Sequence, residues 1–185
     1  MKKTLLFAFV ALFAFGCNSG ENKADTKSAD STGKSAASAD TKYDYPYTLG
    51  REYQDWQAGD QQHAVNALKS LKAFETNNIP ECVGYFGDSV EVSFDYMRMK
   101  LPHDSLSKNF TMWRNEYTNL TIKMEDWESV ISKDKKSEWV TMWYKQIMTD
   151  KKGKTDSLEV TDDCKFVNGK IVVLDEKIQH YPAKK

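Results

Sequence analysis

The stretch EVTDDCKFVNGKIVVLDEKI, residues 159–178, decides the fold. At its centre, Asn168 and Gly169 form a dipeptide typical of a two-residue type I′ hairpin turn, because both central positions of that turn need positive φ. Apolar residues alternate with polar ones on both sides of the dipeptide, which predicts two antiparallel strands. Pairing Val167 with Lys170 across the turn then sets the register of the whole hairpin.

That register divides the side chains of the hairpin between two faces of the sheet. The first face holds the pairs Phe166/Ile171, Cys164/Val173, Asp162/Asp175 and Val160/Lys177, and the second holds Lys165/Val172, Asp163/Leu174, Thr161/Glu176 and Glu159/Ile178. The pair Asp162/Asp175 sets like charges directly across the ladder, which destabilises it unless water, a cation or a shared proton intervenes. We interpret it as a charged patch with Lys145 and Lys177 on an exposed or dimer-forming face; a catalytic dyad is the alternative.

The preceding residues extend the sheet. Turn signals at 133–136 and 150–154 divide the chain from residue 120 to the hairpin into long strands. The strand between these turns is expected to add side chains to both faces, because strand residues alternate in direction. It adds Trp139, Trp143 and Lys145 to the first face, and Val140, Met142, Tyr144 and Met148 to the second.

Helices are expected ahead of the strands. Helical spacing of apolar residues, followed by one alternating segment, predicts helices over 61–77, 79–86 and 104–117, and a strand over 90–94. We expect Asp60 and Asp104 to cap the first and third helices, and Pro80 to lie in the first turn of the second. Helices followed by a meander of long antiparallel strands indicate an α+β fold with the helices on one sheet face.

Composition restricts the class of protein. The chain has 185 residues, with 26 Lys and Arg against 27 Asp and Glu, and 40% of its residues are hydrophobic. These values exclude wholesale disorder, and the charge balance argues against a general nucleic-acid binder. His63, His103 and His180 are far apart and lack ligand spacing, so we expect no metal site, and no motif predicts a cofactor.

The beginning of the chain carries an export signal. Lys2 and Lys3 precede a charge-free apolar run over residues 4–15, which is too short to span a bilayer and is typical of a secretory signal peptide. Cys17 follows, so residues 1–16 resemble a bacterial lipoprotein signal whose Cys becomes acylated. Asn18 is not Asp, the residue that retains enterobacterial lipoproteins in the inner membrane, so the resemblance implies the outer membrane. Plain secretion with an incidental Cys is the alternative.

A tether is expected to separate this anchor from the folded domain. Residues 17–42 contain no aromatic, Val, Ile, Leu or Met side chain, so they cannot bury enough apolar area to offset their ordering entropy. Residues 43–185 form the predicted domain, beginning with an aromatic strap at Tyr43, Tyr45, Tyr47, Tyr53 and Trp56. Cys82 and Cys164 are interpreted as buried free thiols, although a disulfide stays possible outside the cytosol.

The order of these elements resembles a known superfamily. NNI at 77–79, YFGD at 85–88 and GKIV at 169–172 are similar to segments of nuclear transport factor 2, ketosteroid isomerases and SnoaL-like polyketide cyclases. The resemblance covers about residues 60–181. It implies a cone-shaped fold, in which a curved antiparallel sheet carries about three helices on one face. It also implies a pocket between sheet and helices, with dimerisation through the other sheet face.

The resemblance also implies site residues. It makes the second face the pocket wall, with Asp163 and Glu176 as candidate catalytic acids. The expected ligand-binding residues are Met142, Tyr144, Asp163, Leu174, Glu176 and Ile178. Parts of the isomerase and cyclase patterns are missing, because residues 61–77 contain no Tyr, only Asp95 matches the isomerase base, and no His-Trp pair precedes Glu176.

Three functions stay open on these grounds. The first is a membrane-anchored binding or structural lipoprotein, held by lipidated Cys17, that takes up a small apolar or amphipathic ligand or a partner protein. The second is an isomerase or cyclase that uses Asp163 and Glu176 as acid and base. The third is a partner-binding module, expected as a homodimer through the face that bears Trp139 and Trp143.

Overall fold

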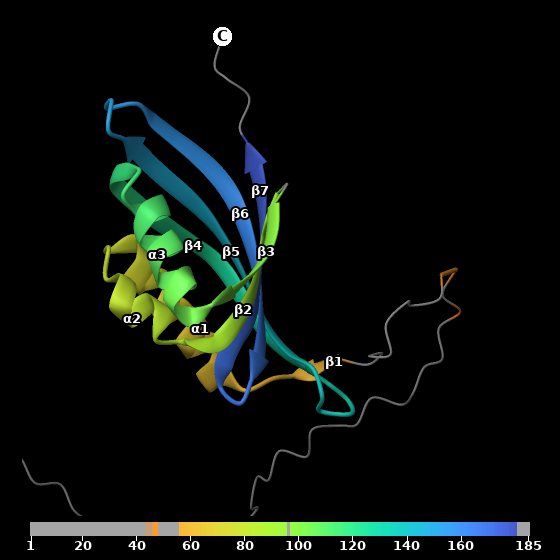
Figure 1. The fold of residues 1–185 in the computed structure, drawn as a ribbon. Coiled ribbons are helices and arrows are strands. Elements are labelled where there is room, and N and C mark those ends of the chain that lie inside the picture. The colour runs from red at the N-terminus through yellow and green to blue at the C-terminus, as the bar shows by residue number, and fades with distance from the viewer. Residues whose placement is uncertain (1–43, 45, 48–55, 96, 181–185) are drawn as a thin grey trace, which may run out of the picture. The chain divides into compact units, whose positions relative to one another are not determined.

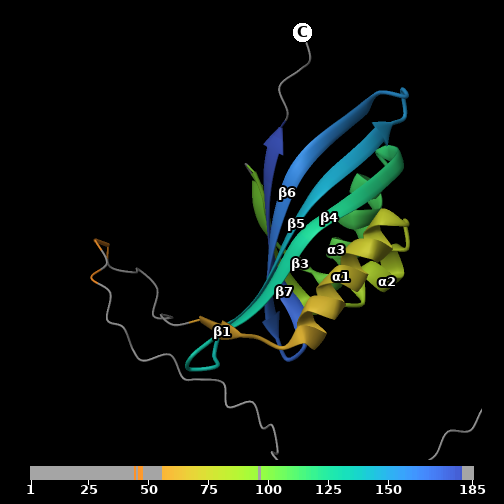
Figure 2. The ribbon, with the colours of Figure 1, turned by 180° about the vertical axis from the view of Figure 1, so that it is seen from behind.

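The computed structural model describes residues 44, 46–47, 56–95 and 97–180, and everything below lies in the unit Pro46–Lys185. The fold is built on a curved seven-stranded sheet with strand order β1-β4-β5-β6-β7-β2-β3 (Figures 1 and 2). The strands are β1 (Trp56–Ala58), β2 (Phe86–Phe94), β3 (Met97–Pro102), β4 (Tyr117–Ser132), β5 (Glu138–Asp150), β6 (Thr155–Val167) and β7 (Lys170–His180). Neighbouring strands are antiparallel except β2 and β7, which run parallel, so the sheet is mixed rather than purely antiparallel.

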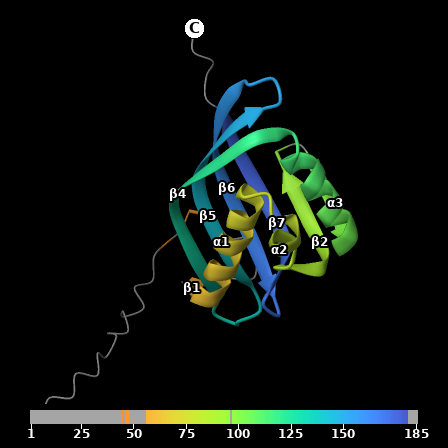
Figure 3. The same ribbon diagram turned by 90° about the vertical axis from the view of Figure 1, so that its left-hand side faces the viewer.

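Three helices cover one face of this sheet. They are α1 (Gln61–Glu75), α2 (Ile79–Val83) and α3 (His103–Arg114), and all three lie in front of the strands in Figure 3. Between helices and sheet lies a core that includes Ala67, Leu106, Val140 and Ile171, each at most 1% exposed. The predicted α+β fold with three helices on one sheet face is therefore confirmed.

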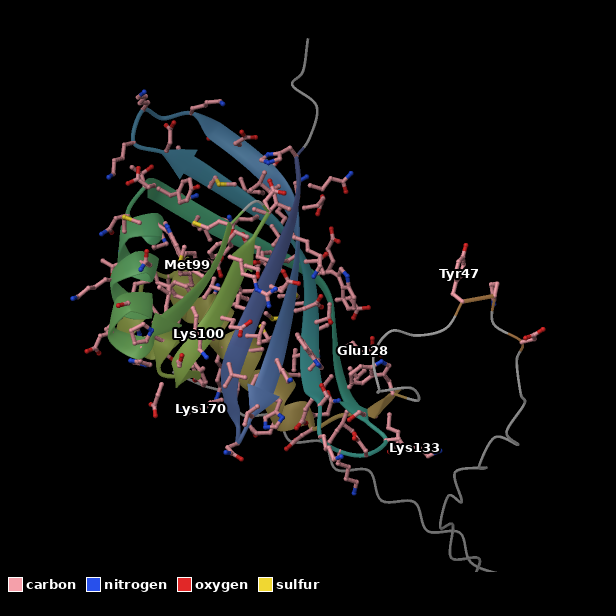
Figure 4. All side chains as sticks on the ribbon, turned by 45° about the vertical axis from the view of Figure 1, so that its right-hand side comes forward. Tyr47, Met99, Lys100, Glu128, Lys133 and Lys170 are labelled. Atoms are coloured by element: carbon pink, nitrogen blue, oxygen red, sulfur yellow. The ribbon has the colours of Figure 1, made fainter. Side chains whose placement is uncertain are left out.

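The predicted starts of α1 and α2 hold, but α2 ends at Val83 and β2 begins at Phe86, inside the span predicted as the second helix. The Asp60 side chain caps α1 by accepting a hydrogen bond of 2.8 Å from the Gln62 N–H, as expected. The three predicted turns connect β4 to β5, β5 to β6 and β6 to β7; Lys133 and Lys170 mark the first and last in Figure 4. Asn168 and Gly169 have φ of 51° and 75°, the positive values that a type I′ turn requires.

Other expectations were wrong, or concern residues outside the described part of the chain. Asp104 does not cap α3, because Pro102 occupies the N-cap position and Asp104 lies inside the first turn. The sequence prediction omitted the edge strands β1 and β3; β3 contains Met99 and Lys100, labelled in Figure 4. The signal segment, the tether with Cys17, and strap residues 43, 45 and 53 lie outside the described residues, while Tyr47 is exposed.

The register of the final hairpin differs from the predicted one. Pairing begins as expected, with Val167 opposite Lys170 and Phe166 opposite Ile171. It then shifts by one residue, because Lys165 pairs with Val173 and leaves Val172 as a bulge. The prediction that Asp162 pairs with Asp175 was therefore wrong. Asp162 lies opposite Glu176, and Asp163 lies opposite Asp175.

A buried arginine joins the helices to the sheet. Arg114, at the end of α3, is 7% exposed and donates three hydrogen bonds to backbone carbonyls. Two reach Phe74 and Glu75 at the end of α1, each at 3.1 Å, and the third reaches Tyr117 at the start of β4, at 3.0 Å. One guanidinium group thus donates to two carbonyls at the end of α1 and to one at the start of β4, and it fixes α1 and α3 against β4.

Replacing this arginine with an apolar residue is expected to destabilise the fold. Arg114→Leu should lower the free energy of unfolding by on the order of 3 kcal/mol, because three part-buried carbonyl oxygens lose a donor, although that of Phe74 keeps another, the Asn77 N–H. Urea unfolding followed by circular dichroism measures the change. The matched control is Arg98→Leu, which removes an exposed ion pair with Glu91 and should cost less than about 1 kcal/mol. Equal losses in the two variants would contradict this role for Arg114.

Candidate functional site

A cavity of about 410 Å³ lies between the inner face of the sheet and the helices. Strands β5, β6 and β7 form its floor, and residues of all three helices and of β2 form the remaining wall. Most of the lining is apolar, with Phe74, Phe94, Phe110, Trp113, Met142 and Leu174 among its members. This size and this mixture of apolar walls with few polar groups are typical of small-molecule sites.

Asp162 is the polar centre of the cavity floor. It lies on β6 in line with the apolar residues Val160 and Cys164, and it is 4% exposed. The Tyr144 hydroxyl on neighbouring β5 donates a hydrogen bond of 2.9 Å to its Oδ2 atom. Its Oδ1 atom is buried without a hydrogen-bond partner among the described residues. A buried carboxyl oxygen without a hydrogen-bond donor costs free energy, so a donor on a bound molecule would stabilise it.

Glu176 completes a pair of carboxyl groups. It lies directly opposite Asp162 on β7 and also lines the cavity. Burial raises the pKa of Asp162 to about 7, against the lowering effect of the Tyr144 hydrogen bond. Burial, together with the nearby Asp162 carboxyl, raises the pKa of Glu176 well above its usual range. Near neutral pH the pair therefore retains protons that exposed carboxyl groups would have released.

A second acidic pair lies on the opposite face of the same strands. Asp163 and Asp175 face each other there, and the Lys177 ammonium lies 2.6 Å and 3.1 Å from their carboxylate oxygens. Thr141 donates a further hydrogen bond of 2.6 Å to Asp163. Burial alone would lower the pKa of Lys177, but its bonds to the two carboxylates raise it overall. The outer pair is thus bridged by an ammonium group that offsets one of its two negative charges.

The structure places five of the six predicted pocket residues at the cavity: Met142, Tyr144, Leu174, Glu176 and Ile178. Asp163 is the exception, and the expectation that it faces the pocket was wrong because β6 presents its other side there. Asp162 lies in the cavity instead, so its interpretation as part of a charged patch on an exposed or dimer-forming face was wrong. A signal for this position existed, because Leu158, Val160, Cys164 and Phe166 form an alternating apolar row with Asp162 in its middle.

The two cysteine side chains at the cavity are unreactive near neutral pH. Cys82 and Cys164 both line it, and both are buried free thiols. Burial raises the pKa of Cys82 to about 11 and that of Cys164 well above its usual value, so neither is a thiolate near neutral pH. Within the described part of the chain, no three His, Cys, Asp or Glu side chains gather as metal ligands.

Comparison with known proteins identifies the fold. No family model and no curated protein sequence matches the chain. Among solved structures, AusH from Aspergillus nidulans is similar over 69% of this chain and 90% of its own, with a TM-score of 0.54 and 11% identity. An NTF2-like protein from Exiguobacterium sp. 255-15 covers 62% of this chain and 98% of its own, with a TM-score of 0.51 and 14% identity.

A third similar structure is an LEH-like epoxide hydrolase from M. tuberculosis. It covers 64% of this chain and 84% of its own, with a TM-score of 0.52 and 10% identity. Identities this low speak for the fold and leave the chemistry to be argued from the site. The chain has the nuclear transport factor 2-like fold, as its sequence motifs predicted.

The carboxyl pair should make stability depend on pH. The folded-state pKa of Asp162, about 7, lies above its unfolded value of 3.8, so its favourable contribution is complete below about pH 4 and is lost as pH rises to about 7. Asp162→Asn removes this titration but keeps an oxygen for Tyr144. We expect the unfolding free energy of the wild type, measured against that variant, to fall by on the order of a few kcal/mol across this range. Urea unfolding at several pH values measures it, and parallel curves for the two proteins would refute the assignment.

Proposed function

We propose that this domain binds a small apolar or amphipathic molecule in the cavity between its sheet and helices. The observation that carries the proposal is a cavity of about 410 Å³ with apolar walls, whose floor holds the carboxyl groups of Asp162 and Glu176. The apolar lining would cover the body of the ligand. The two carboxyl groups and the Tyr144 hydroxyl would fix the orientation of its polar end.

The buried carboxyl groups are better explained by a binding site than by imperfect packing of the core. A buried carboxyl group costs free energy unless it is paired, and here the Oδ1 atom of Asp162 has no partner in the described part of the chain. A core selected only for stability would replace such a group with an apolar residue of similar volume. Retaining two of them beside an apolar cavity supports a role in binding.

Filling the cavity should abolish binding. Ile178→Trp inserts an indole ring at a half-buried lining position of β7, so the affinity for a fluorescent naphthalene probe should fall by at least about tenfold. Fluorescence titration of the purified full chain measures the dissociation constant. The matched control is Gln179→Trp, at the adjacent exposed position, which should bind as the wild type does. Probe binding that is absent in the wild type, or unchanged in Ile178→Trp, would contradict the proposal.

An acid–base enzyme is the second candidate, and one observation favours it. The pKa of Asp162, at about 7, lies near the operating pH at which a general acid or base is most effective. Asp162 would replace Asp163 in the role first assigned to that residue, with Glu176 as its partner. An isomerase or cyclase of this kind would convert its ligand and lose turnover when either carboxyl group is removed, whereas a binding protein would release its ligand unchanged.

We also propose that the domain is tethered to the bacterial outer membrane through acylated Cys17. The supporting features are the charged start, the short apolar run and the polar tether that precede the domain. No helix among the described residues is long and apolar enough to cross a membrane. A lipid anchor would keep the binding cavity at the membrane surface, where amphipathic molecules concentrate.

Removing the acylation site should release the protein from membranes. The full chain expressed in a bacterial host should sediment with the membrane fraction and incorporate radiolabelled palmitate. Cys17→Ser should lose the label and the lipid-dependent sedimentation, whereas Cys82→Ser, which changes a buried thiol within the domain, should keep both. Labelling that persists in Cys17→Ser would exclude the anchor.

A further inference from the structure

The charges around the cavity are strongly one-sided. Its lining contains four carboxylic acids, Asp95, Glu116, Asp162 and Glu176, and among the described lining residues only His180 is basic. No lysine or arginine of the described chain belongs to that lining. Burial raises the pKa of Asp162 and Glu176, but a cation bound between them would lower it again, so the cavity favours molecules that combine a positive charge with an apolar body over anions.

The nearest cations already have partners. A second hollow of about 450 Å³ adjoins the cavity; it shares Phe94, Asp95, Met97, Glu176 and Ile178 with it and adds Arg98 and Lys177. Arg98 donates to Glu91 at 2.9 Å, and Lys177 holds the outer carboxylates of Asp163 and Asp175. These side chains are thus occupied elsewhere, and the inner pair keeps an unpaired, buried Oδ1 atom on Asp162.

The outer acidic pair shows which group complements such an arrangement. Asp163/Asp175 and Asp162/Glu176 are successive cross-strand pairs of β6 and β7 on opposite faces of the sheet. The outer pair is bridged by a primary ammonium, the Nζ atom of Lys177. An ammonium group carries three donors and no acceptor, which matches carboxylate oxygens that lack donors.

We propose, building on the binding function above, that the ligand is an amphipathic organic amine whose protonated amino group lies between Asp162 and Glu176. Its apolar body lies along the cavity against Met142, Leu174 and Trp113. Aromatic rings in the lining add attraction for the cation where their faces are exposed to it. The protonated amino group donates hydrogen bonds to the inner carboxyl pair, as the Lys177 ammonium does to the outer pair.

Four probes of equal chain length test this proposal: n-octylamine, 1-octanol, 2-octanone and octanoate. Each competes with the fluorescent naphthalene probe for the purified full chain near neutral pH, where the amine is protonated. We expect the amine to bind at least about tenfold more tightly than the alcohol or the ketone, and octanoate to bind most weakly, because only the amine pairs with the carboxyl groups.

Variants of single carboxyl groups test whether the amine binds at Asp162 and Glu176. Asp162→Asn should weaken amine binding by at least about tenfold and leave octanol binding within about twofold. Glu176→Gln, at a half-buried position, gives the same test if Asp162→Asn does not fold. The control Asp163→Asn removes the neighbouring carboxylate from the outer face and should leave amine affinity unchanged, because Asp163 does not line the cavity.

The outcomes separate this inference from the function on which it rests. Octanol or octanone binding as tightly as octylamine would overturn the amine assignment while leaving the binding cavity in place. Equal weakening by Asp163→Asn and Asp162→Asn would also overturn it, because the attraction would then come from overall charge. If none of the four probes displaces a fluorophore that binds, the amine assignment fails while the binding cavity stands; if the fluorophore itself does not bind the wild type, the binding function fails as well.

Discussion

A one-residue shift in the pairing of β6 with β7 determines the character of the site. Without the bulge at Val172, Asp162 would lie opposite Asp175, and Glu176 would lie opposite Thr161 on the outer face. With it, two carboxyl groups meet on the inner face and two others meet on the outer face. The bulge therefore sorts four acidic residues into an outer pair that Lys177 bridges and an inner pair in a cavity whose lining contains no described lysine or arginine.

The two pairs illustrate how surroundings set the chemistry of identical groups. On the outer face, the Lys177 ammonium pairs with both carboxylates. In the cavity, burial disfavours charge, so Asp162 and Glu176 retain their protons to higher pH. A fold that keeps such a pair pays in stability and gains a polar anchor at the end of an apolar space. Arg114 offsets part of that cost by fixing the helices that close the cavity.

Much of this fold can be predicted from the sequence. Asn168 and Gly169 predict the hairpin turn, the apolar spacing after Asp60 predicts α1, and alternation in β5 identifies Met142 and Tyr144 as inward-facing. The bulge could not be predicted, because Val172 and Val173 are equally apolar and no glycine marks the irregularity. A single undetected residue reverses the direction of every side chain beyond it, which explains the errors in the register and its paired residues.

The assignment of Asp163 to the pocket has a different origin. It followed the strand position that ketosteroid isomerases use, rather than the apolar row in β6 to which Asp162 belongs. Local alternation was the better guide, because residues two apart in a strand point to the same face. Asp162 therefore lies on the face of its buried apolar neighbours. The edge strands β1 and β3 were missed because short strands carry little periodic signal.

The register of β6 and β7 is the claim on which the site depends, and nuclear Overhauser contacts between backbone protons measure it directly. The account predicts cross-strand contacts that join Asp162 with Glu176 and Asp163 with Asp175. Contacts that instead join Asp162 with Asp175 and Asp163 with Leu174 would show an unbroken ladder. That result would take Glu176 away from Asp162 and contradict the carboxyl pair.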